Sequence, residues 1–326
     1  MHVAILDEEL PYPPNSGKRI RTYNLVKRLA ARHRITYVCH QNPQPDEADQ
    51  AAKHFKALGI EPLIVPRPVP PKHGWRFAAR LFGNLFSPLP YSVATHRSRA
   101  LSQQVRRLAA TQEIDLWHCE WTPYAQSVKP LVGVPWVVVA HNVESMIWQR
   151  MAENETNPAR RWYIQLQHRK FRCFERWAYS HATRCIAVSD QDACQLTTEF
   201  GAQQVDVVEN GVDIDYFAPS GESRDPHTIL FLGSLDWRPN LDAVRLLIER
   251  IFPTVQREEP QARLQIVGRK PPEWLRRMAD RPGLELHADV ADVRPFLGRA
   301  GMLAVPLRIG GGSRLKILEA LACGTP

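Results

Sequence analysis

The sequence predicts an α/β protein of two domains, each built on a parallel sheet with helices crossing between the strands. Three observations predict this fold class. Apolar residues alternate along the chain between short runs typical of buried strands and segments with the 3.6-residue period of helices. The length of 326 residues suits about two domains of ordinary size. A polar, turn-rich stretch at 219–226 divides this alternating pattern into two halves.

The first half begins with a buried strand and repeats the strand–helix unit. Short apolar runs, which are typical of strands buried on both faces, predict strands at 2–6, 35–40, 60–65, 115–119, 136–140, 185–188 and 205–208. Helical periodicity predicts helices at 18–32, 46–58 and 158–181, two basic helices before residue 115, and a helix capped by Asp190. The proline-rich segment 66–71 is predicted to be an extended linker.

The second half restarts the pattern after a boundary that we place between residues 218 and 219. Predicted strands cover 228–232, 264–267, 284–287 and 302–306, and predicted helices cover 242–251, 273–279 and 293–300. A last helix, capped by Ser313, is predicted near the end of the chain. We therefore expect an N-terminal domain at 1–218 and a C-terminal domain at 219–326.

The composition is typical of a soluble, cytoplasmic protein. Hydrophobic residues make up 44% of the chain, and there is no apolar run of about 18 residues that would predict a membrane span. The first nine residues lack the basic start and apolar core of a signal peptide. The six cysteines form no C-x-x-C pair, which favours reduced, buried cysteines over disulfides or a zinc site.

The net charge of +8 is concentrated in one stretch, because no acidic residue lies between Glu61 and Glu113. This stretch carries the basic residues Arg67, Lys72, Arg76, Arg80, Arg97, Arg99, Arg106 and Arg107. Aromatic residues are interleaved with them, which predicts peripheral contact with a membrane surface through residues 67–107. The alternative is a helix with its apolar face on the core and its arginines in water. No nucleic-acid motif accompanies the charge, so we expect no nucleic-acid partner.

The last 25 residues combine a strand, a glycine-rich turn and a helix. The glycines of this turn are Gly310, Gly311 and Gly312. Glycines let backbone amides approach a ligand, and a helix N-terminus favours an anion. Arg314 and Lys316 add two cations beside the turn, and Glu319 offers a carboxylate to sugar hydroxyls. Together these groups suit a phosphate attached to a sugar, as in a nucleotide-sugar.

The segment 310–320, followed by Gly324, Thr325 and Pro326, resembles the donor-binding signature of family 4 of the retaining glycosyltransferases. The resemblance implies the GT-B fold, in which two Rossmann-like domains face a cleft. Family members usually continue beyond this signature, so we expect a C-terminally truncated chain with an incomplete second domain. The Gly-Gly-Gly-Ser-Arg-Leu-Lys variant resembles a subgroup of sugar transferases associated with exopolysaccharide and exosortase systems.

The resemblance assigns roles to residues in the first half of the chain. Gly17, in the loop after the first strand, would face the donor phosphate or the acceptor. Lys18, Arg19 and Arg21 follow it and would either attract lipid phosphates or be solvated. His141 lies at the end of a predicted parallel strand, where α/β proteins bind ligands, and would contact the transferred sugar.

The resemblance also assigns three places near and beyond the middle of the chain. Asn210 and Gly211 would form an interdomain hinge or line the cleft, although turn chemistry alone explains them almost as well. Val290 and Ala291 would hold the base of the nucleotide. Glu319 would contact its ribose.

Two positions depart from the family pattern. In the loop that would bind the donor diphosphate, Gly233 is followed by Ser234 where an arginine is usual, and Pro239 replaces the usual lysine. A diphosphate still needs cations in a site of low dielectric constant. We expect Arg314 and Lys316 to supply them, with a contribution from Arg238.

The second departure concerns a glutamate that usually precedes Glu319 by eight residues, because Gly311 stands at that position. Backbone amides of the glycine turn would then contact the sugar instead, and the identity of the donor sugar stays open.

These features predict a retaining glycosyltransferase of the hexosyltransferase type. It would transfer a sugar from a nucleotide-diphosphate-sugar to a saccharide or lipid-linked acceptor, in cell-surface or exopolysaccharide synthesis. No Asp-x-Asp motif is present, so we expect neither a metal nor another cofactor. Two alternatives stay open: a GT-B nucleotide-sugar epimerase, and a catalytically weak scaffold that binds the sugar donor. The expected location is the cytoplasm, with peripheral contact at the inner face of the cell membrane.

Overall fold

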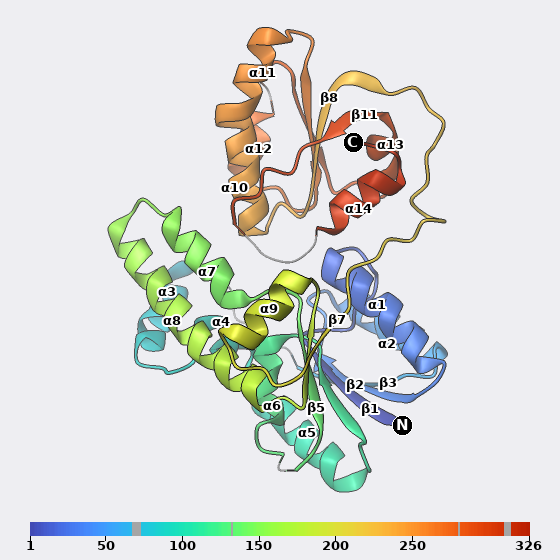
Figure 1. The fold of residues 1–326 in the computed structure, drawn as a ribbon, viewed down its shortest axis with the longest axis vertical. Helices are drawn as coiled ribbons and strands as arrows, with labels where there is room; N and C mark the ends of the chain where they lie inside the picture. Colours follow the sequence, from blue (N-terminus) through green and yellow to red (C-terminus); the bar gives the residue numbers. More distant parts are fainter. Residues whose placement is uncertain (67–72, 132, 280, 310–313) are drawn as a thin grey trace. The chain divides into compact units, whose positions relative to one another are not determined.

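The chain folds into two compact α/β units, Met1–Glu209 and Asn210–Pro326. The computed structural model, drawn in Figure 1, describes residues 1–66, 73–131, 133–279, 281–309 and 314–326. The boundary predicted after residue 218 falls inside the second unit. The reason is that residues 210–224 form no helix or strand before the first strand of that unit begins at Asp225.

The first unit contains a seven-stranded sheet in which every pair of neighbouring strands is parallel. Its strands are β1 (His2–Asp7), β2 (Arg34–His40), β3 (Glu61–Val65), β4 (Leu116–Cys119), β5 (Trp136–Ala140), β6 (Arg184–Ala187) and β7 (Val205–Val207). They lie in the order β3-β2-β1-β4-β5-β6-β7. The order reverses between β1 and β4, and ligands of doubly wound sheets bind at the carboxyl ends of strands at such a point.

Helices connect these strands, as crossover connections between parallel strands require. They are α1 (Gly17–Ala30), α2 (Pro45–Ala57), α3 (Gly74–Leu85), α4 (Tyr91–His96), α5 (Arg99–Thr111), α6 (Ala125–Val128), α7 (Glu144–Glu153), α8 (Pro158–His181) and α9 (Asp190–Thr198), with a short 3₁₀ turn at Thr122–Tyr124. The two basic helices predicted before residue 115 correspond to α3 and α5, and the short helix α4, which contains no lysine or arginine, lies between them in the sequence. Ser98 starts α5, because its side chain accepts a hydrogen bond from the Leu101 amide and caps that helix.

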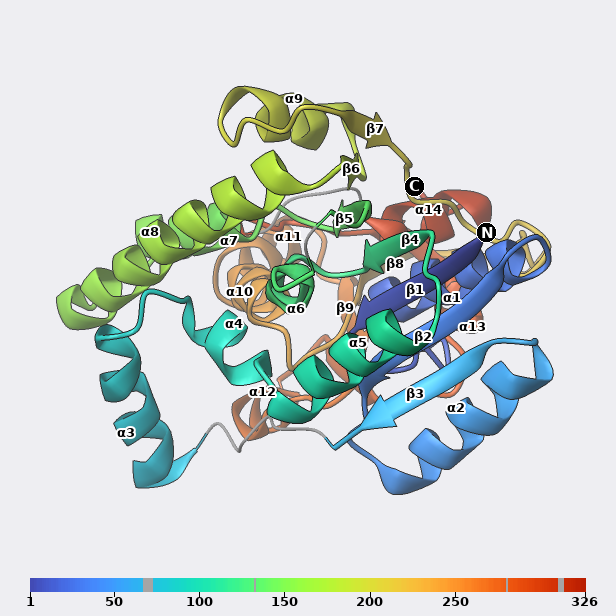
Figure 2. The ribbon, with the colours of Figure 1, turned by 90° about the horizontal axis from the view of Figure 1, so that it is seen from below.

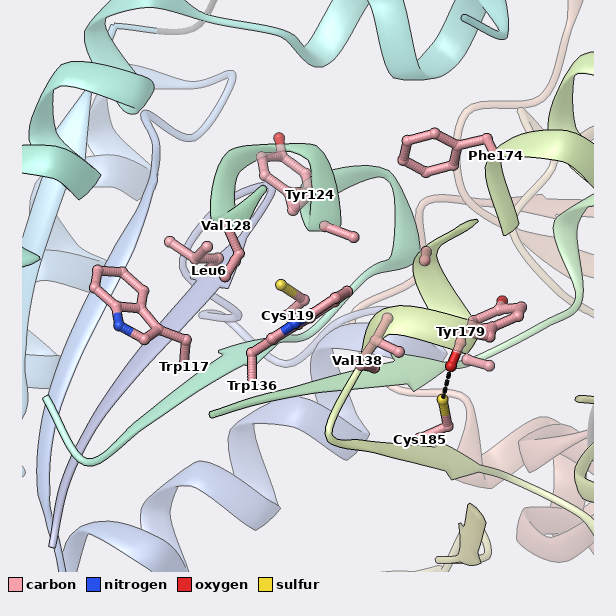
Figure 3. Close-up of a cluster of buried hydrophobic side chains, with 14 of the residues drawn as sticks. Leu6, Trp117, Cys119, Tyr124, Val128, Trp136, Val138, Phe174, Tyr179 and Cys185 are labelled. Carbon is pink, nitrogen blue, oxygen red and sulfur yellow. Dashed lines mark hydrogen bonds between the residues drawn. The ribbon is translucent and has the colours of Figure 1, made fainter. Parts of the chain in front are cut away.

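Two hydrophobic clusters cover the two faces of this sheet, following the two-residue period of the strands. Ala4 and Leu6 of β1 belong to the cluster that includes side chains of α5, α6 and α8. Val3 and Ile5 belong to the opposite cluster, with side chains of α1 and α2. Figure 2 shows α5 and α1 on opposite sides of the sheet. Figure 3 shows the first cluster, where the Cys185 thiol donates to the Tyr179 carbonyl at 3.5 Å.

The second unit contains a four-stranded parallel sheet in the order β10-β9-β8-β11. Its strands are β8 (Asp225–Leu232), β9 (Arg263–Gly268), β10 (Leu284–Ala288) and β11 (Ala300–Leu303). Its helices are α10 (Arg238–Leu246), a π-helical turn (Leu247–Ile251), α11 (Phe252–Glu258), α12 (Glu273–Met278), α13 (Arg294–Arg299) and α14 (Leu315–Ala322). The two parallel sheets confirm the predicted fold class.

The start of two helices in the second unit differs from the prediction. The helix predicted at 242–251 starts earlier, at Arg238, because Pro239 occupies a first-turn position that needs no backbone N–H donor. The last helix begins at Leu315, with Arg314 in the cap position and making no side-chain cap. The N-cap is therefore one residue later than the predicted Ser313, and that prediction was wrong. Ser313 itself lies outside the described residues.

Candidate active site

Two buried carboxylates lie at the point where the strand order of the first sheet reverses. Asp7 is the last residue of β1 and Glu120 directly follows β4. The two residues are only 1% and 4% exposed, respectively. Buried charges need partners, so the groups around these two carboxylates define what this end of the sheet can do.

Glu120 collects three partners from three different elements. The Thr22 hydroxyl of α1 donates to Glu120 Oε1 at 2.7 Å, and His118 Nε2 of β4 lies 2.7 Å from Oε2. His141 Nε2, just beyond β5, lies 3.0 Å from Oε1, an ion-pair distance without the direction of a hydrogen bond. Burial raises the pKa of Glu120, but the close contacts and charges of the two histidines outweigh it and hold that pKa well below its usual range. Glu120 is therefore an anion that orients His141.

Asp7 is held by Lys18 and Tyr37. Lys18 Nζ lies 2.5 Å from Asp7 Oδ1, and the Tyr37 hydroxyl donates to Oδ2 at 2.7 Å. Burial raises the pKa of Asp7, and the charge of Lys18 opposes that rise. Gly17, the predicted ligand contact, is the first residue of α1 and immediately precedes this lysine.

The other basic residues at the start of α1 are also engaged inside the first unit. Arg19 is paired with Glu9 at 2.7 Å and with Glu47 at 3.2 Å. Arg21 donates to the carbonyls of Val208 and Glu209 at 2.6 and 2.7 Å. The expectation that Lys18, Arg19 and Arg21 attract lipid phosphates or are solvated was therefore wrong, because folding pairs all three with acceptors of the chain itself.

The loop that carries His141 is tied to α8. Backbone amides of Glu144 and Ser145, at the start of α7, donate to the two oxygens of Glu175 at 2.7 and 3.1 Å. Glu144 in turn accepts from Trp121 Nε1 at 2.9 Å. Burial is the main reason that the pKa of Glu175 is raised to about 8. This carboxyl from α8 replaces the missing side-chain cap of α7 and so helps to position the preceding loop.

Two pockets border this end of the first unit. A pocket of about 110 Å³ has charged walls that include Asp7, Glu8, Glu9 and Lys18. A second pocket of about 670 Å³ reaches His118 and Glu120, and aliphatic side chains of α1, β5 and β6 form much of its wall. The smaller pocket offers acceptors and donors suited to a hydroxyl-rich ligand.

In the second unit, the loop after β8 packs closely against the end of β9 and against Lys316. A Cβ atom on Gly233 would lie 2.7 Å from both Lys316 Nζ and Asn240 Nδ2. A Cβ atom on Gly268, at the end of β9, would lie 2.0 Å from the Gly233 carbonyl oxygen. Only glycine fits at position 268, where a Cβ atom would meet backbone, whereas at position 233 it would meet the ends of two side chains.

Lys316 is a half-buried cation beside this loop. Its Nζ donates to Asn240 Oδ1 at 3.1 Å and lies 4.7 Å from the centre of the Phe231 ring. Burial, followed by the nearby charge of Arg314, lowers the pKa of Lys316 to about 8, although Glu319 opposes this shift. Glu319 is 9% exposed, and its own pKa is raised by burial against the influence of Lys316. A lysine whose charge is this poorly compensated favours the arrival of an anion.

The other predicted residues of the second unit lie as follows. The Ser234 hydroxyl donates to Asp236 at 2.7 Å, and Arg238 is exposed at the start of α10. Val290 and Ala291 follow β10, where Val290 packs against the hydrophobic cluster of α13 and α14. Asn210 and Gly211 begin the second unit. Gly310, Gly311 and Gly312 lie outside the described residues, so the structure does not test their predicted contacts.

Sequence reasoning missed Glu120, Thr22, Glu175 and Asn240. A signal for Glu120 was present, because it directly follows a buried strand, just as His141 does. The others could not be found in this way. Thr22 and Glu175 lie within helices α1 and α8, and only the folded chain brings them to the carboxyl ends of the strands.

No set of three or more histidine, cysteine, aspartate or glutamate side chains suited to a metal ion is found in the described parts of the chain. Whether the protein uses a metal therefore stays a prediction from the sequence.

Comparison with known proteins connects both units to sugar transfer. Residues 16–216 match the model of Glycosyltransferase Family 4, and residues 226–326 match Glycosyl transferases group 1. A D-inositol 3-phosphate glycosyltransferase of Kribbella flavida is 30% identical over 172 residues, which are 44% of this chain and 39% of that protein. The match thus spans well under half of the curated relative's length.

Solved structures share the fold at low sequence identity. Sucrose-phosphate synthase of Thermosynechococcus elongatus has a TM-score of 0.67 at 16% identity, covering 100% of this chain and 80% of its own. Medicago truncatula UGT71G1 complexed with UDP-glucose has a TM-score of 0.56 at 11% identity, covering 100% and 78%. At these identities the likeness shows the fold alone, and that fold is GT-B.

Proposed function

This chain belongs to Glycosyltransferase Family 4, and from that premise we propose that it transfers a sugar from a nucleotide-diphosphate-sugar to a saccharide or lipid-linked acceptor. We further propose that the transfer retains the anomeric configuration and serves cell-surface or exopolysaccharide synthesis. Matches to glycosyltransferase models in both units support sugar transfer.

The position of Lys316 is the observation that carries the sugar-donor part of the proposal. Its neighbours are the amide of Asn240, the ring of Phe231 and the close-packed glycine loop, and the charge of Glu319 favours its protonated form. Among the described residues no carboxylate forms an ion pair with this ammonium group, and a diphosphate would supply the anionic partner. Lys316 thereby takes over the task of the cations that are absent at Ser234 and Pro239.

The remaining residues take the following parts in the proposed reaction. As the sugar leaves, negative charge grows on the diphosphate, and Lys316 with Arg314 would stabilise it. Glu319 would accept hydrogen bonds from the ribose. His141, held by the anionic Glu120, would orient the transferred sugar. The charged pocket beside Asp7 would receive the hydroxyl groups of the acceptor.

We also propose that the protein works in the cytoplasm and contacts the inner face of the cell membrane within residues 67–107. In the parts of the chain that the structure describes, no helix is both long and apolar enough to span a bilayer. Exposed aromatic side chains on α3 support peripheral contact.

Calorimetric titration with UDP-, GDP-, ADP- and CDP-sugars tests the sugar-donor site. We expect one nucleotide class to bind, and Lys316→Met to weaken that binding by roughly 30-fold or more, because a buried charge pair is lost. The matched control is Lys270→Met, whose lysine is 64% exposed and should not alter binding. Equal binding by both variants would contradict the role of Lys316.

Product analysis tests the reaction itself. With the binding nucleotide-sugar and saccharide acceptors, proton NMR of the product should show the anomeric configuration of the sugar donor. Inverted product would contradict retention. Conversion of the nucleotide-sugar into its epimer without an acceptor would favour the epimerase alternative, and tight binding without turnover would favour the scaffold.

A further inference from the structure

Helix α3 presents apolar side chains on two opposite faces. Phe77 and Leu81 are partly buried, and Phe77 packs edge-on against Tyr91 with ring centres 5.9 Å apart. On the other side, Trp75, Phe82 and Phe86 are 76%, 64% and 79% exposed. Their spacing of seven and four residues places these three rings in one stripe along the helix. A surface helix of a globular protein needs only one apolar face, so the second stripe requires another partner.

Helix α5 lies in the same basic stretch but behaves differently. Its apolar residues Leu101, Val105 and Leu108 are buried in the core, and Arg106 and Arg107 are exposed. This is the ordinary arrangement, with the apolar face on the protein and the arginines in water. The alternative interpretation of the basic stretch, a helix with its apolar face on the core and its arginines in water, therefore describes α5 but not α3.

The end of α3 is hydrogen-bonded to the middle of α8, which brings further exposed aromatic and basic side chains into this region. Gln167 donates to the Asn84 side chain at 2.9 Å, and Lys170 donates to the Asn84 carbonyl at 2.5 Å. Figures 1 and 2 both draw α3 beside the first half of α8. That half carries Trp162, which is 58% exposed, and the exposed Arg160 and Arg161. The only acidic residue of α8 is the buried Glu175.

We propose that this α3–α8 surface, made of Trp75, Phe82, Phe86, Trp162, Arg160 and Arg161, docks on a bilayer that contains anionic lipid. The inference rests on the proposed action at a membrane and replaces the broad segment 67–107 by two helices. Aromatic rings settle at the boundary between headgroups and acyl chains, and arginines attract anionic headgroups. Arg76 already lies 5.5 Å from the Trp75 ring, so a cation sits beside the stripe as well.

The positive charge around the aromatic stripe favours a membrane over an apolar protein partner. The stripe is flanked by arginines, and no acidic residue interrupts the sequence between Glu61 and Glu113. A surface that pairs apolar rings with basic groups complements an anionic bilayer, where both parts find a partner at once. A second protein would need an apolar patch that is ringed by acidic residues.

Vesicle sedimentation with the full 326-residue chain tests the proposal. We expect binding to vesicles of phosphatidylcholine mixed with phosphatidylglycerol, and much weaker binding to phosphatidylcholine alone. The variant Arg160→Glu/Arg161→Glu should bind the mixed vesicles roughly 30-fold more weakly, since each surface arginine contributes severalfold. The variant Trp75→Ser/Phe82→Ser/Phe86→Ser should also lose most binding. Circular dichroism verifies that each variant is folded.

The matched control is Arg106→Glu/Arg107→Glu, which makes the same change of charge on α5 and should keep binding within about threefold. An equal loss in this control would show that net charge alone attracts the protein, and would overturn the proposal. Absence of binding by the unaltered chain would also overturn it. So would a dimer that dissociates when the three aromatic residues are replaced.

Nucleotide-sugar titration separates this inference from the proposed function. All surface variants should bind the nucleotide-sugar like the unaltered protein, because the surface belongs to the first unit and Lys316 to the second. Sugar-donor binding without vesicle binding would sink the docking surface alone. Vesicle binding without sugar-donor binding would sink the proposed function and leave the surface standing.

Discussion

The two units bury their charges in opposite ways. In the first unit, Glu120 has Thr22, His118 and His141 around it, and Asp7 has Lys18 and Tyr37. In the second unit, the half-buried Lys316 has an amide oxygen and an aromatic ring as its close partners among the described residues. The partners of Glu120 keep it ionised against the effect of burial, whereas burial makes Lys316 easier to deprotonate than an exposed lysine.

This difference separates a group that orients its neighbours from a group that can bind a ligand. A carboxylate with several donors is satisfied before any ligand arrives, so it orients its partners. A lysine whose pKa is lowered to about 8 has a poorly compensated charge, which an approaching anion stabilises. This contrast fits the proposal that Lys316 binds the diphosphate of the sugar donor.

Removing the charge of Glu120 should have the largest effect. Glu120→Gln leaves His118 and His141 without an anionic partner, and we expect a loss of about 3 kcal/mol in the free energy of unfolding. Urea denaturation measures it, with the exposed Glu113→Gln as control, expected within about 0.5 kcal/mol of the unaltered protein. Affinity for the nucleoside diphosphate, which lacks the sugar that His141 would contact, should persist. If that affinity disappeared while the protein stayed folded, the contrast between the units would be wrong.

Adding a methyl group at the two glycines of the second unit should have unequal effects. In Gly268→Ala the new Cβ meets the Gly233 carbonyl, so backbone must move, and we expect a loss of about 2 kcal/mol. In Gly233→Ala it meets the ends of the Lys316 and Asn240 side chains, which can swing away. We therefore expect a smaller loss of stability but weaker binding of the nucleotide-sugar. Thermal denaturation and calorimetry of both variants measure the two effects, and the reverse ranking would contradict this packing.

The Glu175 carboxyl should make stability depend on pH. Its pKa of about 8 in the folded state exceeds the unfolded value of about 4.3, so the folded state binds the extra proton between these values. Stability from this group is complete below the unfolded pKa and declines as the pH rises towards 8. In Glu175→Gln the decline should be shallower. Melting temperatures across this range measure the slope, and an unchanged slope would show that Glu175 does not carry it.

The smallest effect concerns the protonation of Lys316. Below pH 8 the lysine carries its charge, so affinity for a diphosphate should be greatest there and fall as the pH rises above that value. Lys316→Arg keeps its charge throughout this range and should flatten the dependence, because guanidinium does not deprotonate. Titrations with the nucleoside diphosphate from pH 7 to pH 9.5 compare the two proteins. Parallel curves would exclude Lys316 as the titrating group.

The sequence predicted much of the second site and less of the first. Lys316, Glu319 and Gly233 stand in motifs whose order along the chain is visible, and the structure places Lys316 against the Gly233 loop. The partners of Glu120 were not visible, since Thr22, which donates to it, lies 98 residues away along the chain. A motif search has no way to join side chains that only a sheet order of β1 beside β4 brings together.

By itself, the sequence determined the α/β class, the succession of strands and helices, and the match of both halves to glycosyltransferase models. Hydrophobic periodicity and local motifs suffice for these, because they depend on neighbours along the chain. Only the tertiary structure decided which charged side chains pair with other groups of the protein. Lys18, Arg19 and Arg21 look like free cations in the sequence but are paired, while the aromatic stripe of α3 is exposed. Burial and pairing depend on contacts between distant segments, and those contacts exist only once the sheet has formed.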